Sequence, residues 1–199
     1  MLGIFGLGKK KINQNHYYDE DIWTKTAKSL EGLIPKGYIV FGELIGWTSN
    51  GKPIQNNYTY DVPKGKAKIY IYRVVIINSD GVLCDLSWDA VREFCNSIGV
   101  AHVPELIQVS IELLTMRRHN DSTDKDFTML DNFMDVNFGT LTYLTDNPVP
   151  LAADSPCDEG VVVRIEGINP QLYKVKAPMF LAHETKELDK GVPDIESES

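Results

Sequence analysis

The sequence predicts an α+β domain of mostly antiparallel strands with helices packed outside. Three observations lead to this prediction. Runs rich in β-branched and aromatic residues are separated by segments whose apolar residues recur at spacings of three and four, as on one face of a helix. A hairpin turn of the type Asn-Ser-Asp-Gly follows one of these runs at residues 78–81. The 199-residue chain is long enough for one domain with a sizeable core.

Most of the predicted regular elements lie in two stretches of the chain, residues 19–99 and 160–190. Strands are expected at residues 37–47, 67–77, 160–165 and 172–177, and helices at residues 19–34, 87–99 and 178–190. Strict alternation along the second strand separates two sets of side chains: Ile69, Ile71 and Arg73 on one face, and Tyr70, Tyr72 and Val74 on the other.

The predicted helices carry start and stop signals as well as apolar sides. The middle helix is expected to begin at a Ser87 cap and to end at Gly99. The residues expected to face inward are Ile22, Trp23, Ala27, Leu30 and Leu33 in the first helix, and Met179, Leu181 and Ala182 in the last.

Composition favours a soluble intracellular protein. The chain is 43% hydrophobic and 24% charged, and its formal net charge of -8 argues against a protein that coats nucleic acid non-specifically, although a local basic site remains compatible with it. The cysteines Cys84, Cys95 and Cys157 form no CxxC pair, so a reducing cytoplasm fits better than a disulfide framework or a zinc site. No secretory signal or membrane span is predicted.

The first eighteen residues combine an apolar start with a basic cluster. The segment MLGIFGLG resembles an interior strand that lacks a partner strand, or a short new start. Lys9, Lys10 and Lys11 follow, with Tyr17 and Tyr18 nearby. These lysines form either a solvated cluster or a phosphate-facing patch flanked by aromatic rings.

Two strand residues upstream are candidates for a site. Glu43 stands among apolar residues of strand 37–47, and a carboxylate buried there needs a partner, either in a functional site or in a structural salt bridge. Tyr72 is either a core residue or a ring at the edge of a pocket, where it could stack on a nucleobase.

The stretch DEGVVVRIEGINPQLYKVKAPMFL, residues 158–181, carries a third group of candidates. Lys174 and Lys176 are two residues apart on a strand, so their ammonium groups point the same way and favour an anion. Glu159, at the start of the neighbouring strand, can hold either the lysines or a metal that shares the anion with them. The alternative is an ordinary solvated strand face.

The order of these segments resembles a known family. GELIGW with Glu43, IYIYRV with Tyr72, DEGVVVR with Glu159 and YKVK with Lys174 and Lys176 resemble motifs III, IIIa, IV and V of the covalent nucleotidyltransferases, which include ATP-dependent DNA and RNA ligases and capping guanylyltransferases. The flanking segments are most similar to the phage-type ATP-dependent RNA ligases. The resemblance covers nearly the whole chain from about residue 9.

The resemblance implies a nucleotidyltransferase fold, that is, a ligase adenylylation domain with its nucleotide pocket between sheets. It implies a partial domain at residues 1–184 followed by an acidic tail at 185–199. The implied activity is RNA repair: ATP-dependent joining of a 5′-phosphate and a 3′-hydroxyl RNA end through an AMP intermediate, with Mg2+ or Mn2+. A phage-encoded member would act in the host cytoplasm.

The resemblance also implies residue roles. Lys174 and Lys176 would be catalytic residues that contact the α-phosphate of ATP, and Glu159 would place the metal. Glu43 would bind the ribose or orient the nucleophilic lysine, and Tyr72 would stack on adenine. Arg164, which closes the DEGVVVR segment, is expected to pair with Glu159 or Glu166.

One family motif is missing. The nucleophilic lysine of the family lies in a K-x-D-G or K-x-N-G segment, and the nearest candidate here, Lys11-Ile12-Asn13-Gln14, lacks the glycine. The expectation is therefore a domain incomplete at its N-terminus and inactive alone, unless an upstream fragment supplies the lysine. The alternatives are a non-catalytic nucleotide- or RNA-binding remnant, a degenerate product without function, and a capping guanylyltransferase-like enzyme.

Overall fold

The computed structural model describes residues 20–55, 58–106, 108 and 159–189. The chain divides into two compact units, one formed by residues 1–103 with 163–173 and the other by residues 104–162 with 174–199. The predictions on the Lys9–Lys11 cluster, its tyrosines and Cys157 lie outside the described residues.

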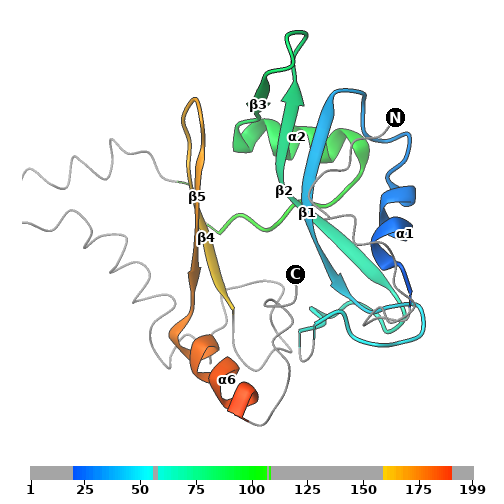
Figure 1. The fold of residues 1–199 in the computed structure, drawn as a ribbon, viewed down its shortest axis with the longest axis vertical. Coiled ribbons are helices and arrows are strands. Elements are labelled where there is room, and N and C mark those ends of the chain that lie inside the picture. The colour runs from blue at the N-terminus through cyan, green and yellow to red at the C-terminus, as the bar shows by residue number, and fades with distance from the viewer. Residues whose placement is uncertain (1–19, 56–57, 107, 109–158, 190–199) are drawn as a thin grey trace, which may run out of the picture. The chain divides into compact units, whose positions relative to one another are not determined.

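The first unit is built on a three-stranded antiparallel sheet (Figure 1). Its strands are β1 (Tyr38–Gly46), β2 (Ala67–Ile77) and β3 (Leu83–Asp85), in the order β1-β2-β3. Two helices belong to it, α1 (Ile22–Ser29) and α2 (Trp88–Ile98). Helices and antiparallel strands together confirm the predicted α+β class.

The ends of α2 form as the sequence predicts. The Ser87 hydroxyl accepts a hydrogen bond from the amide of Ala90 at 3.3 Å, and Gly99 closes the helix with a φ of 67°, in the left-handed region that glycine adopts without strain. The hairpin before α2 is also confirmed, since the Asn78 side chain accepts from the amides of Asp80 and Val82 at 2.9 and 2.8 Å.

One core cluster joins both helices to the sheet. Residues of α2 pack on β2 and β1, together with two residues at and after the end of α1: the cluster contains Leu30, Ile34, Val40, Ile71, Val74, Val91 and Cys95. A smaller cluster of Ile22, Leu44 and Ile54 lies beside it, and Ile69 of β2 packs against both. The sheet therefore presents one continuous apolar face to its helices.

The predicted stripe of the first helix is wrong at its last position. Leu33 is 42% exposed, whereas its neighbour Ile34 is 8% exposed and belongs to the core. The physical reason is that α1 ends at Ser29, so helical spacing no longer decides which side chain faces inward. Gly32, with a φ of 83°, turns the chain after the helix.

A β-bulge overturns the strict alternation predicted for β2. Phe41 pairs with Arg73 and Gly42 pairs with Ile71, so Tyr72 is an extra residue with no partner of its own on β1. Beyond the bulge the facing of side chains shifts by one position. Val74 consequently joins Ile71 in the same core cluster, instead of lying on the opposite face.

The remaining strands form a hairpin that both units share. β4 (Gly160–Ile165) and β5 (Gln171–Lys176) make a two-stranded sheet, and their five-residue connection requires them to be antiparallel. Residues 163–173 of this hairpin belong to the first unit, and its base belongs to the second.

Helix α6 (Pro178–Asp189) follows the hairpin and confirms the predicted helix at 178–190 within one residue. Its buried side differs from the prediction, because Phe180 is 5% exposed and Leu181 is 45% exposed. The domain boundary predicted at residue 184 stays a prediction. No helix in the described part of the chain combines the length and apolar character that a membrane span requires.

Candidate active site

Tyr72 lies at the bulge of β2 and is 38% exposed. A bulge bends its strand and redirects a side chain, and here the ring is partly open to solvent between the buried pairs Tyr70–Ile71 and Val74–Val75. Partial burial raises the pKa of Tyr72, the charge of Glu43 raises it further, and Arg73 lowers it. Glu43 and Tyr72 are therefore electrostatic neighbours.

Glu43 is exposed on β1, opposite Tyr70 in the ladder with β2. The prediction of a carboxylate embedded in a buried strand is therefore wrong, and desolvation gives no reason to assign it a function. Glu43 is nevertheless exposed next to the partly exposed ring of Tyr72, so a polar ligand such as a ribose can reach both side chains.

Arg73 is held in one position by two contacts that sequence reasoning missed. Its guanidinium lies over the Phe41 ring, 5.0 Å from the ring centroid, and it donates to Asp85 through Nε at 2.5 Å and Nη2 at 2.8 Å. The hydrogen bonds to Asp85 raise the pKa of Arg73, and those from Arg73 lower the pKa of Asp85. This bidentate pair ties β2 to the end of β3 beside Tyr72.

The second unit brings Glu159 and Lys176 to adjacent positions. The amide of Ala177 donates to the carbonyl oxygen of Glu159 at 2.9 Å, which places residue 159 opposite the end of β5. Gly160 makes this close pairing possible: its φ is 134°, and a Cβ there would lie 2.0 Å from the carbonyl oxygen of Val175. Only glycine fits this position.

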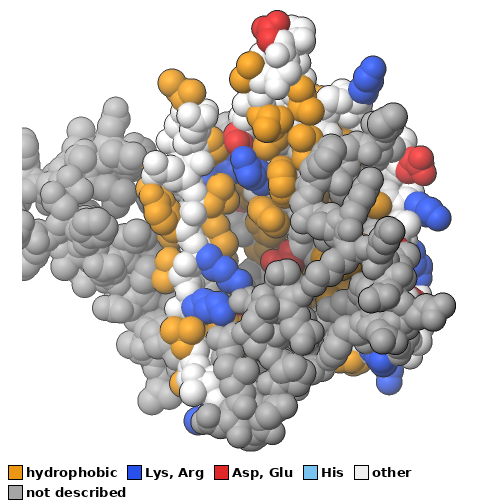
Figure 2. All heavy atoms as spheres, viewed as in Figure 1, with side chains coloured by type: hydrophobic (Ala, Val, Ile, Leu, Met, Phe, Trp, Pro, Cys, Tyr) orange, Lys and Arg blue, Asp and Glu red, His pale blue; other side chains and the backbone are white. Residues whose placement is uncertain are grey.

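Lys174 and Lys176 lie two residues apart on β5, so they share one side of the strand. Lys174 is exposed, whereas Lys176 is half-buried with its Nζ 5.3 Å from the centroid of the Phe180 ring. Figure 2 shows Lys and Arg side chains beside hydrophobic ones over the β4–β5 hairpin. The base of the hairpin thus combines one carboxylate with two cations.

The five predicted site residues fall in two groups. Glu43 and Tyr72 belong to the first unit, and Glu159, Lys174 and Lys176 belong to the second. The structure brings residues together within each group. That all five form one site stays a prediction.

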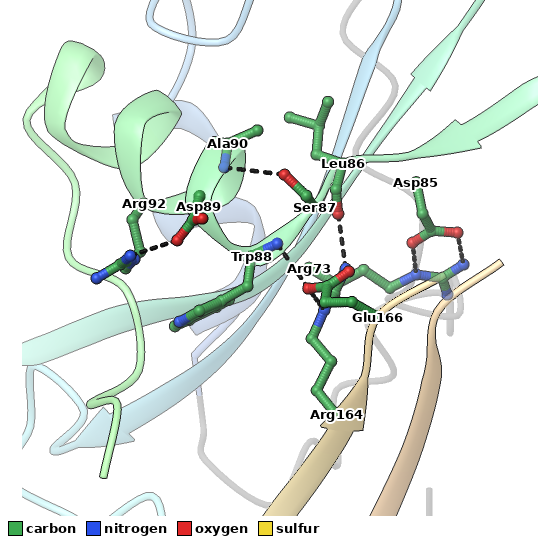
Figure 3. Close-up of polar contacts among 10 residues, drawn as sticks. All are labelled: Arg73, Asp85, Leu86, Ser87, Trp88, Asp89, Ala90, Arg92, Arg164 and Glu166. Carbon is green, nitrogen blue, oxygen red and sulfur yellow. Dashed lines mark hydrogen bonds and ion pairs between the residues drawn. The ribbon is translucent and has the colours of Figure 1, made fainter. Parts of the chain in front are cut away.

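A polar cluster in the first unit resolves the open question of Arg164 (Figure 3). Arg164 pairs with Glu166 and not with Glu159: its Nε donates to Glu166 Oε1 at 2.7 Å. Its Nη2 also donates to the carbonyl oxygen of Leu86 at 2.6 Å, and Glu166 Oε1 accepts from the amide of Trp88 at 2.8 Å. The backbone partners could not be predicted, because they lie far away in the sequence.

The RNA ligase family model matches residues 3–176. The chain belongs to the RNA ligase family. This confirms the family expected from the order of the motifs, and all five predicted site residues lie within the matched range. No curated protein matches the chain. Membership gives this RNA ligase family protein a ligase-like function, with RNA as the substrate class that the family suggests.

RNA ligases generally use ATP and a divalent metal, and Glu159 is the candidate metal ligand in this family member. Among the described residues, no group of three or more His, Cys, Asp or Glu side chains could hold a metal ion. Mg2+ is often bound by one or two carboxylates, with substrate phosphates and waters completing its shell. A single glutamate beside two lysines therefore fits Mg2+ shared with a phosphate, and does not fit a closed structural metal site.

Proposed function

We propose that this chain binds ATP and stabilises its α-phosphate in ATP-dependent RNA strand joining, and that the nucleophilic lysine comes from outside this 199-residue sequence. The observation that carries the proposal is the combination of a family match over residues 3–176 with the lack of any K-x-D-G or K-x-N-G segment in the chain. Without that lysine, no covalent AMP intermediate can form.

The proposed roles follow the two groups of residues. In the first unit, Tyr72 stacks on adenine, where its partly open ring leaves a face available, and exposed Glu43 contacts the ribose or orients the incoming lysine. In the second unit, Lys174 and Lys176 contact the α-phosphate and compensate the charge that develops on its oxygens.

Glu159 would hold Mg2+ or Mn2+, whose positive charge would further stabilise the phosphate oxygens. Three transfers complete the reaction. The lysine nitrogen forms a bond to the α-phosphorus as pyrophosphate leaves. The RNA 5′-phosphate then takes the AMP from the lysine, and the 3′-hydroxyl finally displaces AMP as the strands join.

The first test is adenylylation. Incubated alone with ATP and Mg2+, the chain is expected to show no increase in mass corresponding to AMP. The chain is then mixed with the upstream polypeptide proposed to supply the K-x-D-G strand. In this mixture it is expected to promote AMP transfer to the lysine of that polypeptide. Failure of the mixture, with both polypeptides folded, would exclude the complementation proposal. Replacing ATP by GTP in the same assay tests the capping guanylyltransferase alternative.

A nucleotide-binding protein without catalysis is the second candidate, favoured by the same missing lysine. It predicts that ATP raises the melting temperature of the chain and that no lysine-bearing polypeptide elicits AMP transfer.

Lys174→Ala tests the phosphate contact that both candidates share. The substitution is expected to weaken ATP binding about tenfold or more, because it removes a charge-assisted contact. The measurement is the ATP-dependent shift in melting temperature, converted to an affinity. Lys28→Ala, at an exposed lysine of α1, is the control and should leave the shift unchanged. Equal shifts in both variants would remove Lys174 from the site.

A further inference from the structure

The segment at the end of β4 holds the start of α2 through two neighbouring residues. Arg164 donates to the carbonyl oxygen of Leu86, and Glu166 accepts from the amide of Trp88. These two backbone groups flank Ser87, the cap of α2. The hairpin therefore makes one hydrogen bond on each side of the cap. All four contacting residues belong to the first unit.

The chemistry of each contact suits its position. The amides in the first turn of a helix lack partners within the helix and carry partial positive charge, so a carboxylate is stabilised there. Glu166 supplies that carboxylate, and the Arg164 side chain, 11% exposed, holds it through Nε. Nη1 of Arg164 is buried without a hydrogen-bond partner among the described residues, so the arginine's position is determined by Nε and Nη2.

The contacts continue from the hairpin to the strand that carries Tyr72. The amide of Leu86 donates to the carbonyl oxygen of Val74 on β2 at 2.9 Å, so Leu86 is bonded to β2 on one side and to Arg164 on the other. The charge of Arg164 also contributes to lowering the pKa of Asp85, which pairs with Arg73. Figure 3 shows Arg164, Leu86 and the Arg73–Asp85 pair near the junction of β3 and α2.

We propose that Arg164 and Glu166 form a latch that positions the lysine-bearing hairpin against the β3–α2 junction. Lys174 lies on β5, the strand that pairs with β4, so opening the latch loosens the hairpin that carries it. Arg164 and Glu166 are positioning residues, because they act through the lysines and not on the nucleotide. The expected effect of the latch on ATP binding rests on the proposed function.

Glu166→Gln in the full chain is the first test, matched to Asp89→Asn. Both substitutions neutralise a carboxylate at the first turn of α2. Asp89 pairs with Arg92 of the same helix, whereas Glu166 reaches the Trp88 amide from the hairpin. Glu166→Gln is expected to weaken ATP binding about threefold to thirtyfold. Asp89→Asn should leave the affinity unchanged.

Amide hydrogen exchange gives a readout that does not depend on ATP. Glu166→Ala and Arg164→Lys are expected to speed exchange about tenfold at the Trp88 amide and across the hairpin, because each removes a charge-assisted hydrogen bond of the latch. Arg164→Lys keeps the charge, but an ammonium cannot reproduce the two-sided contact of a guanidinium.

The outcomes separate the latch from the proposed function. Faster exchange in the hairpin with weaker ATP binding supports the latch. Faster exchange confined to Trp88, or a lower melting temperature with unchanged hairpin exchange and ATP affinity, overturns it. If the unsubstituted chain binds no ATP, the proposed function fails, and hydrogen exchange alone then decides whether the latch exists.

Discussion

β2 and β5 both carry predicted site residues, but their surroundings differ. On β2, Ile71 and Val74 are fully buried next to Tyr72, and α2 covers them with Val91 and Cys95. On β5, the neighbours of Lys174 are open to solvent, since Leu172 is 37% and Tyr173 is 50% exposed. A strand within a core is held by apolar burial, whereas an exposed hairpin depends on its hydrogen bonds and on the latch.

The largest expected effect tests this difference directly. Ile71→Ala should lower the free energy of unfolding by about 2–5 kcal/mol, because it leaves a cavity in the core cluster. Leu172→Ala, on the exposed hairpin, should cost less than about 1 kcal/mol. Urea denaturation of both variants gives the comparison. Equal losses of unfolding free energy in the two variants would show that apolar packing holds β5 as it holds β2.

Gly160→Ala tests the close pairing at the base of the hairpin. The added Cβ would meet the carbonyl oxygen of Val175 at 2.0 Å and would occupy a strained φ of 134°, so a loss of about 1–3 kcal/mol is expected. Faster hydrogen exchange at the Ala177 amide would report the loosened pairing with Glu159. Gly167→Ala is the control, since the nearest atom to its added Cβ is 3.9 Å away. Gly160→Ala should therefore lose more stability, and exchange faster at the Ala177 amide, than Gly167→Ala.

Asp85→Asn tests how much the bidentate pair with Arg73 stabilises the first unit. A loss of about 1 kcal/mol is expected near neutral pH, because Arg73 is partly exposed and solvent screens the pair. The lowered pKa of Asp85 sets the sign of the pH dependence: its contribution is present above the unfolded-state pKa of about 3.9 and is lost as pH falls through the lower folded-state pKa.

The difference in stability between the unsubstituted chain and Asp85→Asn should therefore be constant from about pH 5 upward and shrink below about pH 4. Denaturation curves across this range measure it. Asp80→Asn, at the exposed turn between β2 and β3, controls for the loss of a charge. A difference that instead grew toward low pH would contradict the assigned pair.

The smallest expected effect concerns Glu43 and Tyr72. Glu43→Gln should lower the pKa of Tyr72 toward its ordinary value, because the carboxylate charge that disfavours the tyrosinate is removed. Carbon NMR of the tyrosine ring as a function of pH measures this, with Tyr72→Phe assigning the resonance. Glu93→Gln, an exposed carboxylate of α2, should leave the titration unchanged.

The sequence by itself determined those elements whose causes are local. Ser87 and Gly99 bracket α2, and Asn78 with Gly81 forms the turn between β2 and β3, because caps and turns depend on hydrogen bonds and φ angles of adjacent residues. The order of the motifs also identified the family, because that order is a property of the chain alone.

Tertiary structure decided which faces the side chains occupy. The bulge at Tyr72 shifted Val74 to the core side, and the early end of α1 buried Ile34 in place of Leu33, since one extra or missing residue changes the facing of all that follow. The latch formed by Arg164 and Glu166 is likewise visible only in the tertiary structure. Glu166 and Trp88 are separated by 78 residues, and a backbone amide leaves no trace in the sequence that a distant carboxylate will reach it.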